Sequence, residues 1–185
     1  MEMGYGLALS KAWNELKKTG LSQGSVVRFL ADEYALDLES QRVMSLSCNA
    51  PAKDFTAILI LHYLTAVSRG LPYLERHWVS FRELAGIEGY SAAFRKRAIE
   101  PILRKYGNNA EGLLGALKRL PGQRAPEADV GIVLEVFNGV PAMILLWRSD
   151  EEFAAEAAML FDASIKHIFC TEDIAVLAGV IASAL

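Results

Sequence analysis

The sequence has too little cysteine and histidine to suggest a disulfide framework or a metal site. Its 185 residues include two cysteines, Cys48 and Cys170, which are far apart and form no CxxC pair. The three histidines show no metal-ligand spacing either. The first residues also lack the basic start and apolar core of a secretory signal. These absences predict a cytoplasmic protein that holds no metal and no other cofactor.

Long hydrophobic runs are missing as well. The longest, Phe55–Val67, has 13 residues, whereas a membrane-spanning helix needs roughly 20. Proline and glycine, at 6 and 14 residues, are too scarce for a fibrous or low-complexity chain. With 52% hydrophobic and 22% charged residues, the chain can bury a substantial core. We therefore expect a single globular domain over residues 1–185 with no membrane partner.

Several common catalytic fingerprints are absent too. The sequence contains no P-loop, no GxGxxG pattern and no HExxH pattern. Neither Cys48 nor Cys170 has a base beside it in the sequence, as an activated thiolate would suggest. We therefore assign no catalytic residue and favour a non-catalytic protein.

Acidic residues are scarce in the middle of the chain, and basic residues are scarce in its last third. Residues 69–124 carry 11 Lys/Arg against 5 Asp/Glu, whereas residues 125–185 carry 2 against 10. The two parts either pack together and partly neutralise each other, or the basic part forms an anion-binding face. With a net charge of −3 and no recognition motif, the chain is not expected to bind nucleic acid.

Hydrophobic periodicity and cap residues predict most of the helices. The helix that begins at Asp54 is apolar on nearly every face, which predicts a buried central helix ended by Gly70. Pro101 should kink or split another, because it lacks a backbone donor. The predicted helices cover residues 5–19, 21–31, 54–69, 92–106, 111–120 and 171–185.

Two hairpins are predicted between these helices. Alternating apolar residues indicate strands near 34–38 and 43–48. Asn138-Gly139 separates two apolar runs, Val130–Phe137 and Val140–Trp147, and favours a type I′ turn. Residues 121–127 are predicted to be a loop. The expected fold class is α+β, with a helical layer packed around a small antiparallel sheet made of the two hairpins.

The basic part of the chain contains the first candidate site. Arg82 offers a bidentate fork for a carboxylate or phosphate, and Trp78 and Phe81 are suited to wall a pocket. Arg97 is a second candidate cation, and it should point away from Arg95, since the two project about 200° apart on a helix. Alternatively, Arg82 pairs with a nearby acid, and the arginines of residues 95–104 form a solvated face.

The acidic part contains the other candidates. Trp147 ends a predicted strand and Asp150 follows it, and Asp150 is suited either to acid/base chemistry or to capping the next element. Asp162 interrupts an apolar segment, so a buried carboxylate there should have a partner, for which a basic residue of the middle segment is expected. His62, on the apolar helix, is expected to be a satisfied core histidine.

Six segments stand in a characteristic order: Ile60–Leu64, Trp78–Leu84, Phe94–Arg97, Leu146–Phe153, Leu160–Ser164 and Thr171–Ala175. In this order they resemble an uncharacterised family of bacterial and archaeal proteins, catalogued as a domain of unknown function and found mostly in anaerobes. Some members follow a four-cysteine iron–sulfur domain linked to corrinoid and carbon monoxide dehydrogenase systems. The resemblance covers about residues 30–185, which leaves residues 1–30 as a helical extension without cysteine. It implies that one surface or pocket unites Trp78, Arg82, Arg97, Trp147, Asp150 and Asp162.

Together these features predict an accessory or binding domain that docks a protein partner or an anionic small molecule. Its setting is anaerobic one-carbon or corrinoid-linked metabolism, as the resemblance implies. One alternative is a small enzyme that uses Asp150, Glu151 or Asp162 as acid/base with an arginine anion clamp. Another is a homodimeric structural module that pairs through the apolar helix 174–185. Monomer and homodimer both remain open.

Overall fold

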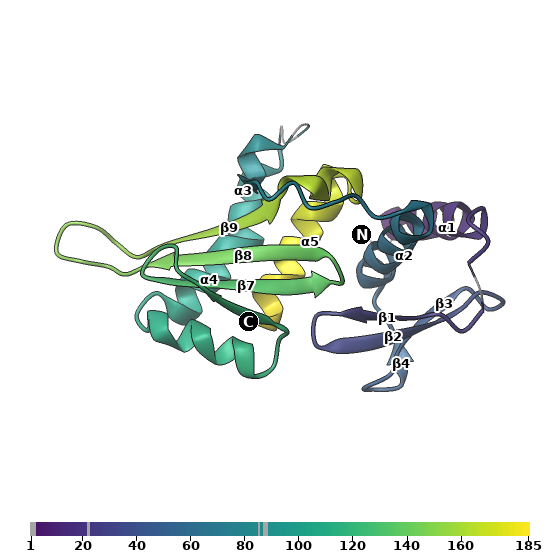
Figure 1. Cartoon of the computed structure of the whole chain (residues 1–185), viewed down its shortest axis with the longest axis horizontal. Helices are drawn as coiled ribbons and strands as arrows, with labels where there is room; N and C mark the ends of the chain where they lie inside the picture. The colour runs from purple at the N-terminus through teal and green to yellow at the C-terminus, as the bar shows by residue number, and fades with distance from the viewer. Residues whose placement is uncertain (1–2, 22, 85, 87–88) are drawn as a thin grey trace.

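The computed structural model describes residues 3–21, 23–84, 86 and 89–185 and divides them into two lobes (Figure 1). The amino-terminal lobe packs two helices against a four-stranded sheet. The carboxy-terminal lobe packs helices against a five-stranded sheet. The elements of the amino-terminal lobe are α1 (Met3–Lys17), β1 (Val26–Phe29), β2 (Asp32–Asp37), β3 (Arg42–Ser45), β4 (Ala50–Pro51) and α2 (Asp54–Arg69).

The strand β1 replaces the helix predicted over residues 21–31, so that prediction was wrong. Val27 and Phe29 are buried, whereas Val26 is exposed and Arg28 is half-buried, which is the period of a strand. The segment pairs antiparallel with β2, with Val27 opposite Tyr34. Its four residues are too few for the sequence to distinguish the period of a helix from that of a strand. Pairing with β2 therefore decides that the segment is a strand.

The helix α2 is the buried central helix that its sequence predicts. Residues from Thr56 to Thr65 are buried except His62, and Gly70 ends the helix with φ 92°. Asp54, a residue type that often caps a helix, does not cap this one. Lys53 occupies the N-cap position without a side-chain hydrogen bond, and Asp54 lies in the first turn, where its charge still complements the helix dipole.

The five-stranded sheet of the carboxy-terminal lobe has the order β5-β9-β8-β7-β6 and is antiparallel throughout. The predicted hairpin forms its centre, but Asn138 is not among the residues with positive φ. Gly139 alone adopts it, at 74°, and a register shift lies between Glu135 and Phe137, so the turn is not type I′. The strands are β5 (Trp78–Ser80), β6 (Gly122–Ala125), β7 (Val130–Phe137), β8 (Val140–Trp147) and β9 (Glu156–Asp162).

The expectation of one small sheet made from two hairpins is therefore incorrect. The two hairpins belong to different sheets, and each recruits further strands. Among these, β6 occupies the predicted loop at 121–127, and β5 has only three residues. Such short or polar segments carry almost no periodic signal, so their strand state depends on the neighbour that supplies hydrogen bonds.

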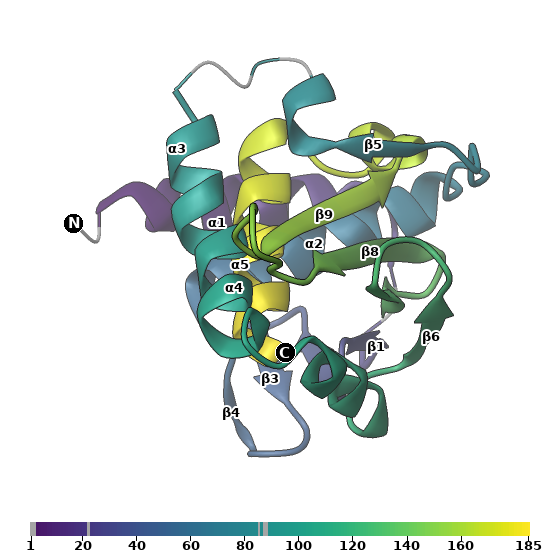
Figure 2. The same ribbon diagram turned by 90° about the vertical axis from the view of Figure 1, so that its left-hand side faces the viewer.

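Helices cover one face of the five-stranded sheet. Figure 2 shows α3 (Ser91–Phe94) and α4 (Glu100–Tyr106) beside α5 (Thr171–Ala184), all on the same side of β8 and β9. A π-helical stretch, η2 (Arg95–Ile99), joins α3 to α4 just before Pro101, so the split expected at this proline is observed. The remaining short helices are η1 (Phe81–Glu83), η3 (Ala110–Lys118) and η4 (Ala163–His167).

The buried core continues from one lobe into the other. Leu16, Ile60 and Leu61 in the amino-terminal lobe and Ile132 and Ile144 in the carboxy-terminal lobe are fully buried members of one hydrophobic cluster. In the described part of the chain, none of the helices has the length and apolar character needed to cross a membrane.

Candidate functional site

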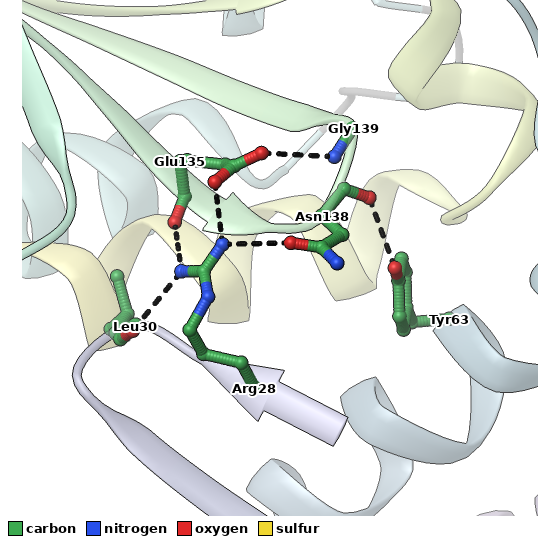
Figure 3. Close-up of polar contacts among 6 residues, drawn as sticks. All are labelled: Arg28, Leu30, Tyr63, Glu135, Asn138 and Gly139. Atoms are coloured by element: carbon green, nitrogen blue, oxygen red, sulfur yellow. Dashed lines mark hydrogen bonds and ion pairs between the residues drawn. The ribbon is translucent and has the colours of Figure 1, made fainter. Parts of the chain in front are cut away.

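Arg28 connects the two lobes at the turn between β7 and β8 (Figure 3). One guanidinium nitrogen donates to the backbone oxygens of Leu30 and Glu135, at 3.3 and 3.0 Å. The other donates to the Glu135 carboxylate at 2.6 Å and to the Asn138 side chain at 3.0 Å. Tyr63 of α2 donates its hydroxyl to the backbone oxygen of Asn138 at 2.9 Å. This Arg28 junction therefore joins β1 and α2 to the central hairpin of the other lobe.

An aromatic stack lies beneath the Arg28 junction. The ring of Phe137 is stacked on Phe29 and on Tyr63, with centroid distances of 4.5 and 4.3 Å. Leu30, next to Phe29, adopts φ 54°, and its N–H donates to the oxygen of Val136 at 2.8 Å. A leucine rarely adopts this conformation, so the contacts on both sides of it must hold the backbone in place.

A cavity of about 620 Å³ lies elsewhere between the lobes. We call it the inter-lobe cavity. Asp32, Tyr34 and Cys48 contribute from the four-stranded sheet and its β3–β4 turn, and Lys53 contributes from the start of α2. Facing them are Arg97 of η2 and a row of small and branched residues of α5: Ala175, Val176, Gly179, Val180 and Ser183.

Hydrogen bonds engage the carboxylate of Asp32 on the wall of this cavity. Ser45 donates to it at 2.6 Å, and the hydroxyl and the backbone N–H of Ser47 both donate as well. Burial by itself would raise the pKa of Asp32, but these hydrogen bonds lower it overall. Burial, together with the negative charge of Asp32, raises the pKa of Tyr34 to about 12. Tyr34 therefore stays protonated and can act as a donor.

A second cavity, of about 520 Å³, runs along the strand β9, and we call it the strand-edge groove. Every residue from Phe153 to Leu160 lines this groove. A cavity over one face of a strand would contact only alternate residues, so the groove follows the edge of β9. The opposite wall is one side of the helical segment α3–η2–α4, with Phe94, Arg95 and Ile99. Phe81 and Arg82 close one end, and the ring of Phe81 stacks on Phe94 at 4.3 Å.

The structure distributes the predicted site residues over more than one place. Phe81 and Arg82 line the strand-edge groove, as just described. Arg97 lines the inter-lobe cavity, and Arg95 lines the groove, in keeping with their opposite directions on the helix. Trp78 lies opposite Asp162 in the pairing of β5 with β9, and Trp147 lies opposite Glu156.

Asp162 is buried, with 4% of its surface exposed, but no basic side chain among the described residues pairs with it as expected. Its carboxylate accepts backbone N–H groups instead, from Glu75 at 3.0 Å, Arg76 at 2.8 Å and Ser164 at 3.0 Å. That prediction was wrong, because backbone donors satisfy a buried carboxylate as well as a cation does. Burial alone would raise the pKa of Asp162, and these hydrogen bonds lower it overall.

Asp150 has a similar arrangement in the exposed β8–β9 loop. Its carboxylate accepts the backbone N–H groups of Glu152 and Phe153 at 2.8 and 2.7 Å, which lower its pKa. The turn places Phe153, 69% exposed, at the end of the groove. Asp150 thus organises the loop before β9, and Asp162 holds the end of the strand. Within the described residues, no ion pair joins a base of 69–124 to an acid of 125–185, so direct pairing does not explain the charge asymmetry.

His62 is satisfied, as its sequence context predicts. Its Nδ1 lies 2.7 Å from the carboxylate of Asp173 in the first turn of α5. His62 and Asp173 line a small cavity together with Cys170. Burial raises the pKa of the Cys170 thiol. A raised thiol pKa keeps the sulfur protonated, which does not favour a nucleophile.

Several residues that the tertiary structure brings together were not predicted. Asp32, Tyr34 and Lys53 wall the inter-lobe cavity, and only the alternation of Asp32 and Tyr34 along a strand indicates a shared face. Residues 20–24 also form a GxSxG pentapeptide that was not predicted to have a role. A nucleophile elbow needs a strand before the serine and a helix after it, whereas here α1 precedes and β1 follows. Ser22 itself lies outside the described residues.

No group of three or more His, Cys, Asp or Glu side chains in the described ranges is arranged to hold a metal ion. No curated protein and no solved structure matches the chain. Residues 15–184 match the family described as a domain of unknown function, DUF3786. The match covers the strand-edge groove and every residue that lines the inter-lobe cavity except Tyr5. The chain therefore belongs to the DUF3786 family of domains of unknown function.

Proposed function

We propose that this protein is an accessory domain that docks an extended, acidic segment of a partner protein in the strand-edge groove. The observation that carries the proposal is the edge of β9, left open within the described residues, beside two arginines that have no partner among those residues. Adding a strand to an exposed sheet edge is a common way to bind a peptide, because the edge offers unpaired backbone groups.

The pairing of β9 leaves part of its outer edge free. On the inner side, β8 pairs with β9 from Phe161 to Glu156. On the outer side, β5 pairs only with the last three residues, from Asp162 to Leu160. No strand among the described residues pairs with Glu156–Met159 on that side. A bound segment can therefore pair with this part of β9, in line with β5, which pairs with the last three residues of the strand.

The register identifies which backbone groups point outward. The N–H of Ala163 donates to the oxygen of His77 at 2.8 Å, so Ala163 faces the β5 side. Hydrogen-bonding direction alternates along an antiparallel strand, so Ala157 directs its N–H and C=O to this same outer edge. Ala158, by contrast, bonds toward β8. A segment added to β9 would therefore pair with Ala157.

Charge identifies the kind of segment. Arg82 and Arg95 line the groove and are exposed, and neither has a hydrogen bond or ion pair within the described residues. Glu83, the acid next to Arg82, accepts the N–H of Ser80 at 2.7 Å in a capping box and so is already engaged. A carboxylate on the partner can pair with either arginine, and the apolar wall formed with Phe94 suits the side chains between.

The family resemblance extends the proposal to a setting. We propose a cytoplasmic, non-catalytic role in anaerobic one-carbon or corrinoid-linked metabolism, where the partner is another protein of that system. The carboxylates of Asp150 and Asp162 support a non-catalytic role, because backbone N–H groups already occupy both.

The test is fluorescence polarisation with a labelled peptide that alternates valine and glutamate. We expect Arg82→Gln and Arg95→Gln each to weaken binding about tenfold, the effect of one charge-assisted hydrogen bond. Arg104→Gln is the matched control, because Arg104 is exposed on the same helical segment but does not line the groove. Equal loss in all three variants, or equal binding of a valine–lysine peptide, contradicts the proposal.

Backbone pairing is tested separately. Ala157→Pro removes one outward N–H, and proline is tolerated where a strand's N–H faces solvent. We expect this variant to keep its circular dichroism spectrum and to lose peptide binding. A peptide N-methylated at alternate residues makes the same test on unmodified protein. If both the variant and the methylated peptide bind normally, strand addition is wrong.

A further inference from the structure

We infer that the inter-lobe cavity binds a small amphipathic anion, with an apolar body against α5 and a carboxylate or phosphate head between Lys53 and Arg97. This site is separate from the strand-edge groove and does not depend on it. At about 620 Å³, the cavity is in the range of small-molecule sites, which typically measure about 300–1,000 Å³.

The two cations of the cavity come from different lobes. Lys53 precedes α2 in the amino-terminal lobe, and Arg97 belongs to η2 in the carboxy-terminal lobe. Both are exposed, and neither has an ion pair within the described ranges. The ammonium of Lys53 lies 5.9 Å from the ring of Phe55, which keeps the charge at the wall of the cavity. Two unpaired cations beside one cavity favour an anionic ligand.

The apolar walls of the cavity come from three helices, α1, α2 and α5. Tyr5 of α1 and Phe55 of α2 form one side, with ring centroids 6.5 Å apart. Val176 and Val180 of α5 form the other, one turn apart on the same helix face. Tyr5 is 41% exposed and Phe55 is half-buried. An aliphatic chain or ring between these walls would remove apolar surface from water, which drives binding.

One acid of the cavity decides where the head group lies. Asp32 carries a negative charge that repels an anion, although Ser45 and Ser47 already donate hydrogen bonds to it. The head group is therefore expected at the Lys53 and Arg97 side, away from Asp32. A bound ligand would contact both lobes at once, so its binding would stabilise their packing.

The experiment uses decanoate, decyl phosphate and the uncharged decanamide as probes in isothermal titration calorimetry with the full chain. We expect both anions to bind, and Lys53→Gln and Arg97→Gln each to weaken them about tenfold without changing decanamide binding. The preferred head group distinguishes a carboxylate ligand from a phosphate ligand. Lys96→Gln is the matched control, because Lys96 is exposed beside Arg97 but does not line the cavity.

A second variant tests the apolar body. Ser183 is exposed on the last turn of α5 and lines the cavity, so Ser183→Phe fills the space without entering the core. This variant should lose all three probes while its thermal unfolding stays unchanged. The inference is overturned if no anion binds at millimolar concentration, if decanamide binds as tightly as decanoate, or if Lys96→Gln weakens decanoate as much as Arg97→Gln.

Discussion

Replacement of Asp162 by alanine should destabilise the protein more than any other single change of a charged residue in its carboxy-terminal lobe. Asp162 ends β9, and its carboxylate holds the segment before β5 by accepting the N–H groups of Glu75 and Arg76, besides that of Ser164. Arg76 adopts φ 54°, which few non-glycine residues adopt. The carboxylate therefore holds a strained chain reversal against the end of the sheet.

The magnitude follows from what each donor can do without the carboxylate. A hydrogen bond to a charged group contributes about 1.5–3 kcal/mol. Glu75 and Arg76 are exposed, so water can replace the carboxylate there, whereas Ser164 is 2% exposed and its N–H would lose its partner. We expect Asp162→Ala to lower the free energy of unfolding by about 3 kcal/mol, and Asp162→Asn by about 2 kcal/mol, since one carbonyl acceptor remains.

Urea unfolding followed by tryptophan fluorescence measures this loss. With a slope of about 2 kcal/mol/M, 3 kcal/mol moves the midpoint by about 1.5 M. Asp150→Ala is the control, because Asp150 accepts two backbone N–H groups in an exposed loop where water can replace it. If Asp162→Ala changes the midpoint no more than Asp150→Ala does, the reasoning about buried backbone donors is refuted.

The same residue predicts a pH dependence. The pKa of Asp162 is lower in the folded protein than the ordinary value of about 3.9. A lowered folded pKa stabilises the protein above the unfolded pKa, and this contribution is lost as the pH falls below about 4 toward the folded pKa. The stability difference between wild type and Asp162→Asn should therefore narrow between pH 6 and pH 3. A constant difference over that range contradicts the assignment.

Three further predictions concern the lobe interface and the thiols. Phe137→Ala should cost about 3–5 kcal/mol in thermal or urea unfolding, because Phe137 is fully buried between two stacked rings; a loss below 1 kcal/mol contradicts this. Arg28→Ala should cost about 1–2 kcal/mol, since the guanidinium is partly exposed and water replaces some of its four bonds; no change in the urea midpoint contradicts it. In Cys48→Ser protein, Cys170 should react with a disulfide reagent at pH 7 more slowly than a free thiol, because burial raises its pKa; an equal rate contradicts it.

Long elements with a clear period were predictable from the sequence. The helix 54–69 and its glycine stop, the C-terminal helix and the two apolar runs around Asn138-Gly139 all occur close to the expected residues. In these segments the secondary structure that the local sequence favours is also the one that buries its apolar residues. Contacts with other elements therefore do not have to override the local preference. The split before Pro101 was predictable for the same reason, because a missing backbone donor is a local property.

The short strands were not predictable. β1 was expected to be helical, β6 was expected to be a loop, and no strand was predicted at β5. Each has only three or four residues and is a strand because a neighbour supplies its hydrogen bonds. The pairing of β5 joins residues far apart in the chain, such as Trp78 with Asp162, so no local pattern encodes it. The strands β1 and β6 pair with the strand next in sequence, but they are too short for their side chains to show a clear period.

The candidate site residues show the same division. The sequence by itself determined the chemistry on offer: an arginine-rich middle, an acidic end and a carboxylate, Asp162, within an apolar segment. Only the tertiary structure decided which groups meet. It placed Arg82 and Arg95 along the edge of β9, and Lys53 opposite Arg97 across the lobes. The physical reason is that composition and periodicity are properties of consecutive residues and can be read from the sequence. A cavity, by contrast, forms where the surfaces of segments distant in the chain do not pack completely against each other.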